Sequence, residues 1–221
     1  MPLGRSHPLA IDQPFHYKEA MPRSTDTRTR LLASARTLLH ARGYADVGVA
    51  EICAHSGVRK GSFYHFFPSK QALTLAMLDA QFEAFEDRLL IPSFNRRLPP
   101  LERLGTFVRA LHHYQSETLA ESGHLLGCPF GNLGLELATR DEPIRIKVES
   151  ILQRIRAYFQ AALEEATTEG SVSGTDPRAT AEAMLAYLEG VLLLARTRND
   201  ARLILELGPA VSEIRIPRPA G

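Results

Sequence analysis

The chain has 221 residues, of which 44% are hydrophobic and 23% charged, a composition that describes a globular protein and excludes a disordered or fibrous one. Its two cysteines, Cys53 and Cys128, are too few for a disulfide-stabilised scaffold. No apolar run approaches the roughly 18 residues that a membrane span needs, and no signal-peptide segment follows the start, so we expect a cytoplasmic protein.

The formal net charge of +1 conceals two parts of opposite sign. Residues 1–70 hold ten Lys or Arg against five acidic residues, whereas the remainder holds 16 against 20. A basic N-terminal part on an acidic body suits a partner with a phosphate backbone.

Residues 1–24 are rich in Pro, His and polar residues and lack helical periodicity, so we predict a flexible N-terminal extension. The segment is interpreted as a dispensable tail rather than as a basic arm that reaches DNA. Met21 opens a second plausible start, and the sequence leaves open whether translation begins at Met1 or Met21.

Three helices are predicted next, over residues 26–42, 49–55 and 60–67. Asp26 suits the N-cap of the first helix. Gly57 suits a sharp corner between the second and third helices, because glycine adopts left-handed backbone conformations readily. This order predicts a helix-turn-helix.

The third helix has two chemically different faces. Val58, Phe63 and Phe67 recur at near-helical spacing and supply its apolar face. The other faces carry cations, hydroxyls and aromatic rings, which can meet phosphates and base edges. Pro68 stops the helix, and a longer helix begins at Lys70.

These residues and their neighbours resemble the TetR family of bacterial transcriptional regulators over about residues 27–75. The matching positions are Leu31-Leu32, Ala35, Leu38-Leu39, Gly43-Tyr44, Val49, Glu51-Ile52, the stretch 57–70 and Ala72-Leu73. The resemblance implies an all-α fold: a three-helix helix-turn-helix DNA-binding domain over residues 25–70 and a helical ligand-binding and dimerisation domain over residues 71–221. Arg59 and Val47-Gly48 depart from the family's usual residues.

The predicted DNA contacts are Arg28, Lys60, Gly61, Ser62, Tyr64, His65 and Lys70. Tyr64 and Lys70 are predicted to contact phosphates. Arg28 is a further phosphate candidate, because a cation in the first turn of a helix is unfavourable with the helix dipole and an anionic partner would relieve this. The alternative for Arg28 is a solvated surface arginine. Lys60, Ser62 and His65 are predicted to reach base edges, with Gly61 allowing close backbone approach. The alternative is a scaffold in which Tyr64 and His65 merely pack.

Further helices are predicted over residues 70–89, 100–121, a segment ending near 139, 143–169, 176–198 and a last one after residue 200. Ile91-Pro92 is expected to end the first of these. Between Ala183 and Ala195 the helix is apolar almost all round, interrupted mainly by Glu189 and Gly190. Such a helix must be covered on every side, so we predict a homodimer with Leu188, Val191, Leu192 and Ala195 at its interface.

Residues 123–133 form a Gly-rich apolar segment that resembles the Gly-Cys-Pro-Phe-type segment of the TetR subgroup similar to LmrA and YxaF. The resemblance implies a small-molecule effector in the larger domain. The predicted pocket residues are Phe107, Leu111, Tyr114, Cys128, Phe130, Asn132, Tyr158 and Tyr187. This set suits a mostly apolar ligand with one or two polar handles, and its lack of Lys and Arg disfavours a strongly anionic one.

The sequence contains no catalytic or cofactor motif, so we predict neither an enzyme nor a cofactor. Metal binding is not predicted, because the adjacent His112 and His113 point about 100° apart on a helix. Whether Cys128 is a redox sensor stays open. The predicted function is a repressor that binds a palindromic operator as a homodimer and is released by its ligand. The alternative is a TetR-fold protein that acts through protein partners or as an activator.

Overall fold

The computed structural model describes residues 24–218, and the predicted extension over residues 1–24 lies outside them except for Ser24. The described chain is helical, apart from an isolated β-bridge between Thr175 and Pro217, so the all-α prediction is confirmed. The elements are α1 (Ser24–Arg42), α2 (Val49–Ser56), α3 (Lys60–Phe66), α4 (Lys70–Phe85), the π-helix η1 (Glu86–Leu90), α5 (Ile91–Ser93), α6 (Pro100–Ser122), α7 (Pro129–Leu137), α8 (Glu142–Thr168), α9 (Pro177–Arg198), α10 (Arg202–Leu207) and the 3-10 helix η2 (Gly208–Glu213). No helix in this range is long and apolar enough to cross a membrane.

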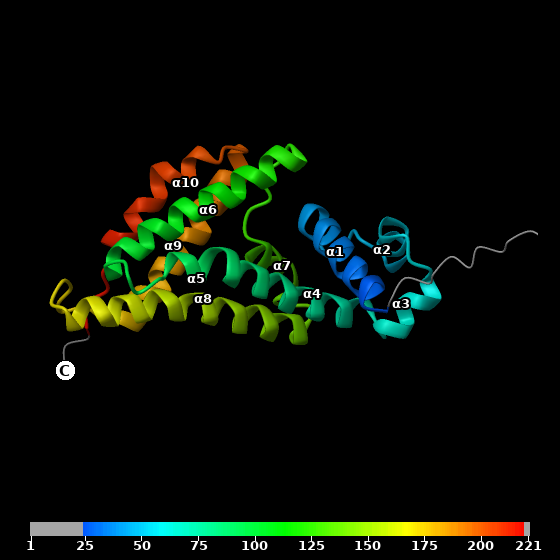
Figure 1. Cartoon of the computed structure of the whole chain (residues 1–221), viewed down its shortest axis with the longest axis horizontal. Helices are drawn as coiled ribbons and strands as arrows, with labels where there is room; N and C mark the ends of the chain where they lie inside the picture. The colour runs from blue at the N-terminus through cyan, green and yellow to red at the C-terminus, as the bar shows by residue number, and fades with distance from the viewer. Residues whose placement is uncertain (1–23, 219–221) are drawn as a thin grey trace, which may run out of the picture.

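Helices α1 to α3 form a small lobe at one end of the molecule, and α4 runs from this lobe into the larger helical domain (Figure 1). The lobe has its own apolar core, in which Leu31, Ile52 and Phe63 are fully buried. Gly57 ends α2 with a φ of 64°, which is the left-handed corner expected between α2 and α3. Asp26 is not the N-cap of α1, because α1 begins at Ser24 and Asp26 lies in its first turn.

The predicted break at Ile91-Pro92 is wrong, because the helical path of α4 continues through η1 and α5 as far as Ser93. The amide of Ile91 donates to the carbonyl of Glu86, five residues earlier, which makes the wide turn of a π-helix. Pro92 follows within the first two positions of α5, directly after the π-helical turn, and it has no amide hydrogen to donate within this continuous helical path.

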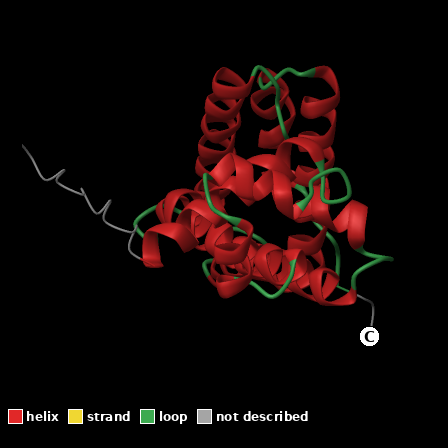
Figure 2. Cartoon of the chain, turned by 90° about the vertical axis from the view of Figure 1, so that its right-hand side faces the viewer, coloured by secondary structure: helices red, strands yellow, loops and turns green. Residues whose placement is uncertain are grey.

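The larger domain is a bundle in which α6, α8 and α9 are the longest helices (Figures 1 and 2). Asp141 and Asp176 cap α8 and α9 by accepting hydrogen bonds from the amides of Ile144 and Ala179. A proline follows each cap within the first two helical positions, where it is tolerated. The bundle core includes Phe159, which is fully buried and packs 5.5 Å from Phe107, measured between ring centroids.

Candidate DNA-binding surface and effector pocket

Helix α3 divides into a buried apolar face and an exposed polar face. Phe63 is 0% exposed, and Val58 and Phe67, which flank α3, are also buried. Tyr64 is 50% exposed although its ring packs edge-on against Phe63, with 5.1 Å between centroids. The predicted separation of faces is therefore present.

The polar face of α3 consists of Lys60, Ser62, Tyr64 and His65, and all four side chains are exposed. None of them forms a hydrogen bond within the described part of the chain. A Cβ placed on Gly61, between the first two, would meet nothing within 4 Å, so the chain's own packing does not require a glycine there. The donors of this face are free to meet an external partner.

Arg28 lies on the exposed side of α1 beside α3. Its guanidinium carbon lies 5.7 Å from the centre of the Phe67 ring, so the cation extends over the end of α3. The positive charge of Arg28 therefore lies next to the C-terminal end of α3.

Lys70 differs from the prediction. Its ammonium donates to the carbonyls of Tyr44 and Val47 at 2.8 and 2.9 Å and lies 3.8 Å from the centre of the Tyr44 ring. Partial burial lowers the pKa of Lys70 below its ordinary value. The side chain holds the α1–α2 connection onto α4, so we correct its role from phosphate contact to structural contact.

Helix α7 of the larger domain holds the same connection from the other side. The Glu136 carboxylate accepts hydrogen bonds from the amides of Tyr44 and Ala45 at 2.7 and 2.6 Å. Such charge-assisted bonds are stronger than bonds between neutral groups. Lys70 and Glu136 therefore fasten one short connection to α4 and α7 respectively.

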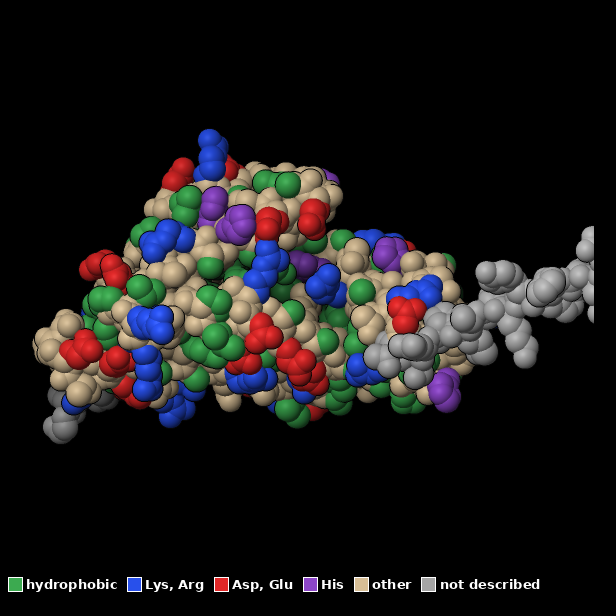
Figure 3. All heavy atoms as spheres, in the orientation of Figure 1, with side chains coloured by type: hydrophobic (Ala, Val, Ile, Leu, Met, Phe, Trp, Pro, Cys, Tyr) green, Lys and Arg blue, Asp and Glu red, His purple; other side chains and the backbone are tan. Residues whose placement is uncertain are grey.

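His40 forms a second contact between the two parts of the molecule. A cleft of about 410 Å³ lies between α1 and α6 (Figure 3). His40 of α1 lines this cleft, and its Nε2 is 3.2 Å from the Gly127 carbonyl oxygen. Gln115 of α6 donates to the same carbonyl. Burial is the main cause that lowers the pKa of His40 to about 4, so the ring is neutral at pH 7 and donates through Nε2.

Half of the predicted pocket residues meet around an inner cavity of the larger domain. Phe107, Leu111, Tyr114 and Cys128 line it, together with Glu189 and other side chains. The cavity volume is only about 30 Å³, far below the roughly 300 Å³ at which small-molecule pockets begin. In this conformation the inner cavity is closed.

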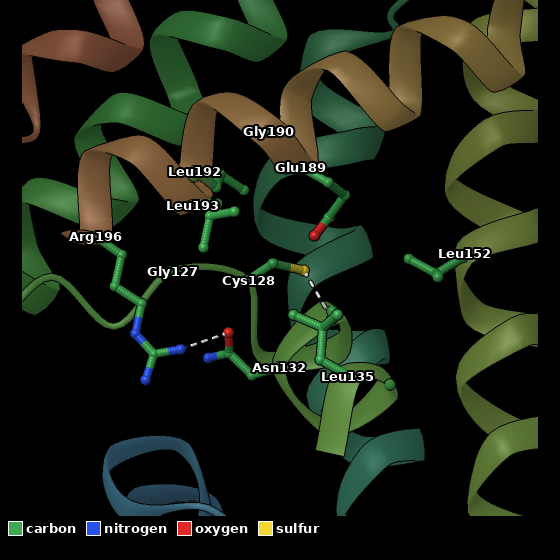
Figure 4. Close-up of a pocket in the computed structure, with 12 residues that line it drawn as sticks. Gly127, Cys128, Asn132, Leu135, Leu152, Glu189, Gly190, Leu192, Leu193 and Arg196 are labelled. Atoms are coloured by element: carbon green, nitrogen blue, oxygen red, sulfur yellow. Dashed lines mark hydrogen bonds between the residues drawn. The ribbon is translucent and has the colours of Figure 1, made fainter. Parts of the chain in front are cut away.

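An outer pocket of about 380 Å³ opens between α7, α8 and α9 (Figure 4). Asn132 lines it, donating to the Leu126 carbonyl and accepting from Arg196 at 2.7 Å. Cys128 and Glu189 line both the inner cavity and the outer pocket, so these two side chains lie between them.

Three predicted pocket residues belong elsewhere. Phe130 is 0% exposed and packs against Phe85, with 5.8 Å between ring centroids. The Tyr158 hydroxyl donates to Glu86 at 3.1 Å, and the Tyr187 hydroxyl donates to the Leu207 carbonyl at 2.8 Å. None of the three lines either space, because their polar or aromatic groups already have partners within the fold.

Glu189 and Arg196 are pocket residues that the prediction missed. Glu189 was visible in the sequence as the charged interruption of an apolar helix. Its carboxyl group faces the thiol of Cys128 (Figure 4). Burial is the main cause that raises the pKa of Glu189, and burial followed by the charge of Glu189 raises the pKa of Cys128. Cys128 is thus a protonated thiol, not an activated thiolate.

The predicted dimer residues are interior to one chain. Leu188, Val191, Leu192 and Ala195 are each no more than 5% exposed in the single subunit. The premise that one subunit cannot cover them is wrong, because α8, α10 and η2 of the same chain pack against α9. The exposed apolar residues of α9 are instead Leu193 and Leu194, at 55% and 42%.

No group of three His, Cys, Asp or Glu residues that could hold a metal ion occurs among residues 24–218. His113 lies 3.4 Å from Glu117, and His112 lies 3.3 Å from the Ser116 hydroxyl. These contacts are ordinary helix-surface pairs at a spacing of four residues.

A helix-turn-helix lobe with free donors, joined by a long helix to a larger helical bundle, defines the class of two-domain helix-turn-helix DNA-binding regulators. Comparison with known protein families identifies the family to which the chain belongs. Residues 31–77 match the family described as "Bacterial regulatory proteins, tetR family", and residues 100–207 match "Tetracyclin repressor-like, C-terminal domain". The chain belongs to the TetR family of helix-turn-helix transcriptional regulators, which are not enzymes.

Individual relatives agree with this assignment. The transcriptional regulator AcuR of Cereibacter sphaeroides is 32% identical, over 89% of each chain. The transcriptional repressor NemR of Escherichia coli K12 is 31% identical over 63% of this chain and 68% of its own. The crystal structure of a regulatory protein TetR from Rhodobacter sphaeroides has a TM-score of 0.75 at 30% identity and covers 86% of this chain and 99% of its own.

The finer assignment stays a prediction. The regulator YxaF of Bacillus subtilis is 29% identical over 81% of this chain and 90% of its own. YxaF is therefore a relative, and membership of its subgroup is not established by this similarity.

Proposed function

We propose that the chain is a repressor that binds a palindromic operator as a homodimer and releases it when a small, mostly apolar molecule enters the larger domain. The observation that carries the proposal is the polar face of α3, defined by Lys60, Ser62, Tyr64 and His65. Its donors are exposed and lack partners in the described chain. The name of NemR as a repressor supports the direction of regulation. A protein in this role works in the cytoplasm.

In the proposed complex α3 lies in the major groove. Lys60, Ser62 and His65 reach base edges, and Gly61 lets the backbone approach closely. Tyr64 and Arg28 contact phosphates on the flanks. Two copies of α3 related by a two-fold axis read half-sites about one helical turn, ~34 Å, or somewhat more apart.

The proposed dimer pairs α9 with its symmetry mate through a face next to the one first predicted. Leu194 is 42% exposed and does not line the outer pocket, so another helix can cover it without closing that pocket. Leu205 of α10 is 43% exposed and extends the apolar area. Exposed apolar surface of this kind favours burial in a subunit interface.

The signal passes from pocket to DNA along α7 as well as α4. Asn132 lines the outer pocket, and Glu136, one helical turn later, holds the α1–α2 connection. A ligand that displaces α7 therefore changes the position of the DNA-binding lobe. The ligand lowers DNA affinity only by binding better to the conformation whose α3 helices are wrongly spaced.

The alternative is action through a protein partner or as an activator. It predicts that substitutions on the polar face of α3 leave DNA binding unchanged. The free donors on that face favour the operator-binding function, because a cationic, hydroxyl-bearing helix suits a phosphate backbone.

A mobility-shift assay on the DNA upstream of the protein's own coding region tests the proposal. In a dimer, the Lys60→Ala/Tyr64→Ala double variant lacks both side chains in each of the two subunits. Because each contact is worth about 1–3 kcal/mol, we expect the affinity for DNA to fall about 100-fold or more. Arg97→Ala, at an exposed arginine before α6, is the matched control and keeps wild-type affinity. Equal affinity of the double variant and the wild type would refute the proposed interface.

A further inference from the structure

Glu189 is a largely buried carboxylate that lacks a cationic partner. No ion pair of this side chain occurs within residues 24–218, and its one interacting polar side chain is the Cys128 thiol. Removing a carboxylate from water is costly unless a positive charge compensates it. Glu189 is also packed closely against Gly131, where an added side chain would collide with its carboxylate oxygen. The fold holds an uncompensated acid at this position.

The surroundings of Glu189 are apolar on both sides. Leu135, Leu152, Leu192 and Leu193 line the outer pocket, and Phe85, Phe107, Tyr114 and Phe159 are among the residues that line the inner cavity. Three side chains, those of Cys128, Glu189 and Leu192, line both spaces and so lie between them. A displacement of the Cys128 and Glu189 side chains joins the outer pocket and the inner cavity.

We propose that the outer pocket binds an amphiphilic organic cation, a protonated amine carried on an apolar or aromatic body, with the ammonium group against Glu189. The leucines receive the apolar body, which enters the inner cavity when the Cys128–Glu189 boundary is displaced. The outer volume of about 380 Å³ suits a small organic molecule. This inference rests on the proposed function only in treating the pocket as the effector site.

The charges around Glu189 agree with this ligand class. Arg196 lines the outer pocket but stands seven residues further along α9, about 10 Å along the helix axis, and its guanidinium bonds to Asn132. Burial raises the pKa values of Cys128 and Tyr114, so both stay neutral near pH 7. Glu189 is therefore the group whose charge a ligand at this boundary meets first.

Binding of a cation favours the ionised form of Glu189. Burial raises the pKa of this carboxyl, so the fold favours its protonated form more than water does. The amine lowers that pKa and releases a proton, and its affinity rises with pH as long as the amine itself stays charged. A neutral ligand of the same shape releases none.

Isothermal titration of the wild-type protein without DNA tests the inference with three probes of one shape: 4-phenylbutylamine, 4-phenylbutanol and 4-phenylbutyrate. We expect the amine to bind about tenfold more tightly than the alcohol, with the carboxylate weakest, because a hydrogen bond between charged groups is stronger than one to a neutral hydroxyl and a second carboxylate is repelled. Titrations in two buffers of different ionisation enthalpy should show proton release with the amine alone.

Glu189→Gln keeps the size of the side chain and removes its charge, so it should abolish the preference for the amine. Glu206→Gln, at an exposed position on α10, is the matched control and should retain it. The inference is overturned if the amine does not bind the wild-type protein, if the alcohol or carboxylate binds as tightly, or if Glu189→Gln keeps the preference. Operator binding in the mobility-shift assay is unaffected by these outcomes, so the two proposals fail separately.

Discussion

The polar face of α3 and the pocket beside α7 handle their polar groups in opposite ways. On α3 the donors are exposed and unbonded within the described chain. Around the pocket Asn132 and Arg196 bond to each other, and Cys128 accepts from the Gly131 amide. The polar face of α3 is therefore exposed as it stands, whereas the inner cavity beside the outer pocket is closed and must be opened.

The difference matters for regulation because α7 belongs to both regions. Its first half borders the pocket through Gly131 and Asn132, and its last turns carry Glu136, which holds the DNA-binding lobe. If the polar face of α3 is rigid, a ligand can change its DNA affinity only by moving the whole lobe of α1 to α3 as a unit. Contacts between the lobe and α7 are thus expected to matter more for the response than contacts within α3.

The largest expected effect comes from comparing a substitution at a buried position of α9 with one at an exposed position of the same helix. Leu188→Glu places a charge in the bundle core, so we expect a loss of about 4 kcal/mol or more in the free energy of unfolding. Leu194→Glu affects an exposed position outside the outer pocket and should leave a folded protein that no longer dimerises. Urea unfolding followed by circular dichroism, with sedimentation for mass, separates the two. A folded Leu188→Glu monomer would restore the interface first predicted.

The junction between the two regions should respond to acid through His40. Its folded pKa of about 4 lies below the ordinary 6.5, so the unfolded state binds a proton first as the pH falls. Stability is therefore lost from about pH 6.5 downward and levels off below about pH 4, with about 2 kcal/mol lost between pH 7 and pH 5.

His40→Gln should remove that pH-dependent loss, measured as the difference between urea-unfolding free energies at pH 7 and pH 5. His113→Gln is the matched control, since the side chain of His113 is 74% exposed. If the His40 variant loses as much stability as the wild type, the ring is not buried neutral at this junction.

A smaller effect tests α7 as the contact to the DNA-binding lobe. Glu136→Gln replaces a carboxylate that accepts two amide hydrogens with an amide that can accept through one oxygen. We expect hydrogen exchange of the Tyr44 and Ala45 amides to accelerate about tenfold, equivalent to about 1.4 kcal/mol. Glu83→Gln, exposed on α4, should leave both rates unchanged. Unchanged exchange in Glu136→Gln would remove α7 from the proposed route.

The sequence was most informative where local chemistry decides the structure. The Gly57 corner, the buried Phe63 and the exposed Tyr64 follow from backbone freedom and helical spacing alone. The caps Asp141 and Asp176 follow the same logic, because an aspartate just before a helix accepts a hydrogen bond from an amide of the first turn. The continuation through Pro92 was missed because a π-helical turn has no sequence signature that single residues reveal.

Long-range contacts account for the other errors. Lys70 bonds to carbonyls 26 and 23 residues away, and Tyr158 and Tyr187 find partners 72 and 20 residues away. Helical periodicity cannot identify such partners. It also cannot tell an apolar face covered within one subunit from one covered by another, so it placed Leu188 at the dimer interface.

The polar face of α3 is tested most directly by comparing operator DNA with random DNA of the same length in one competition assay at fixed salt. His65→Ala should lower the ratio of the two affinities about tenfold or more, since a base-edge contact carries about 1–3 kcal/mol of discrimination. Tyr64→Ala should weaken both affinities alike and leave the ratio unchanged. If His65→Ala leaves the ratio at its wild-type value while Tyr64→Ala leaves both affinities intact, α3 does not read the operator.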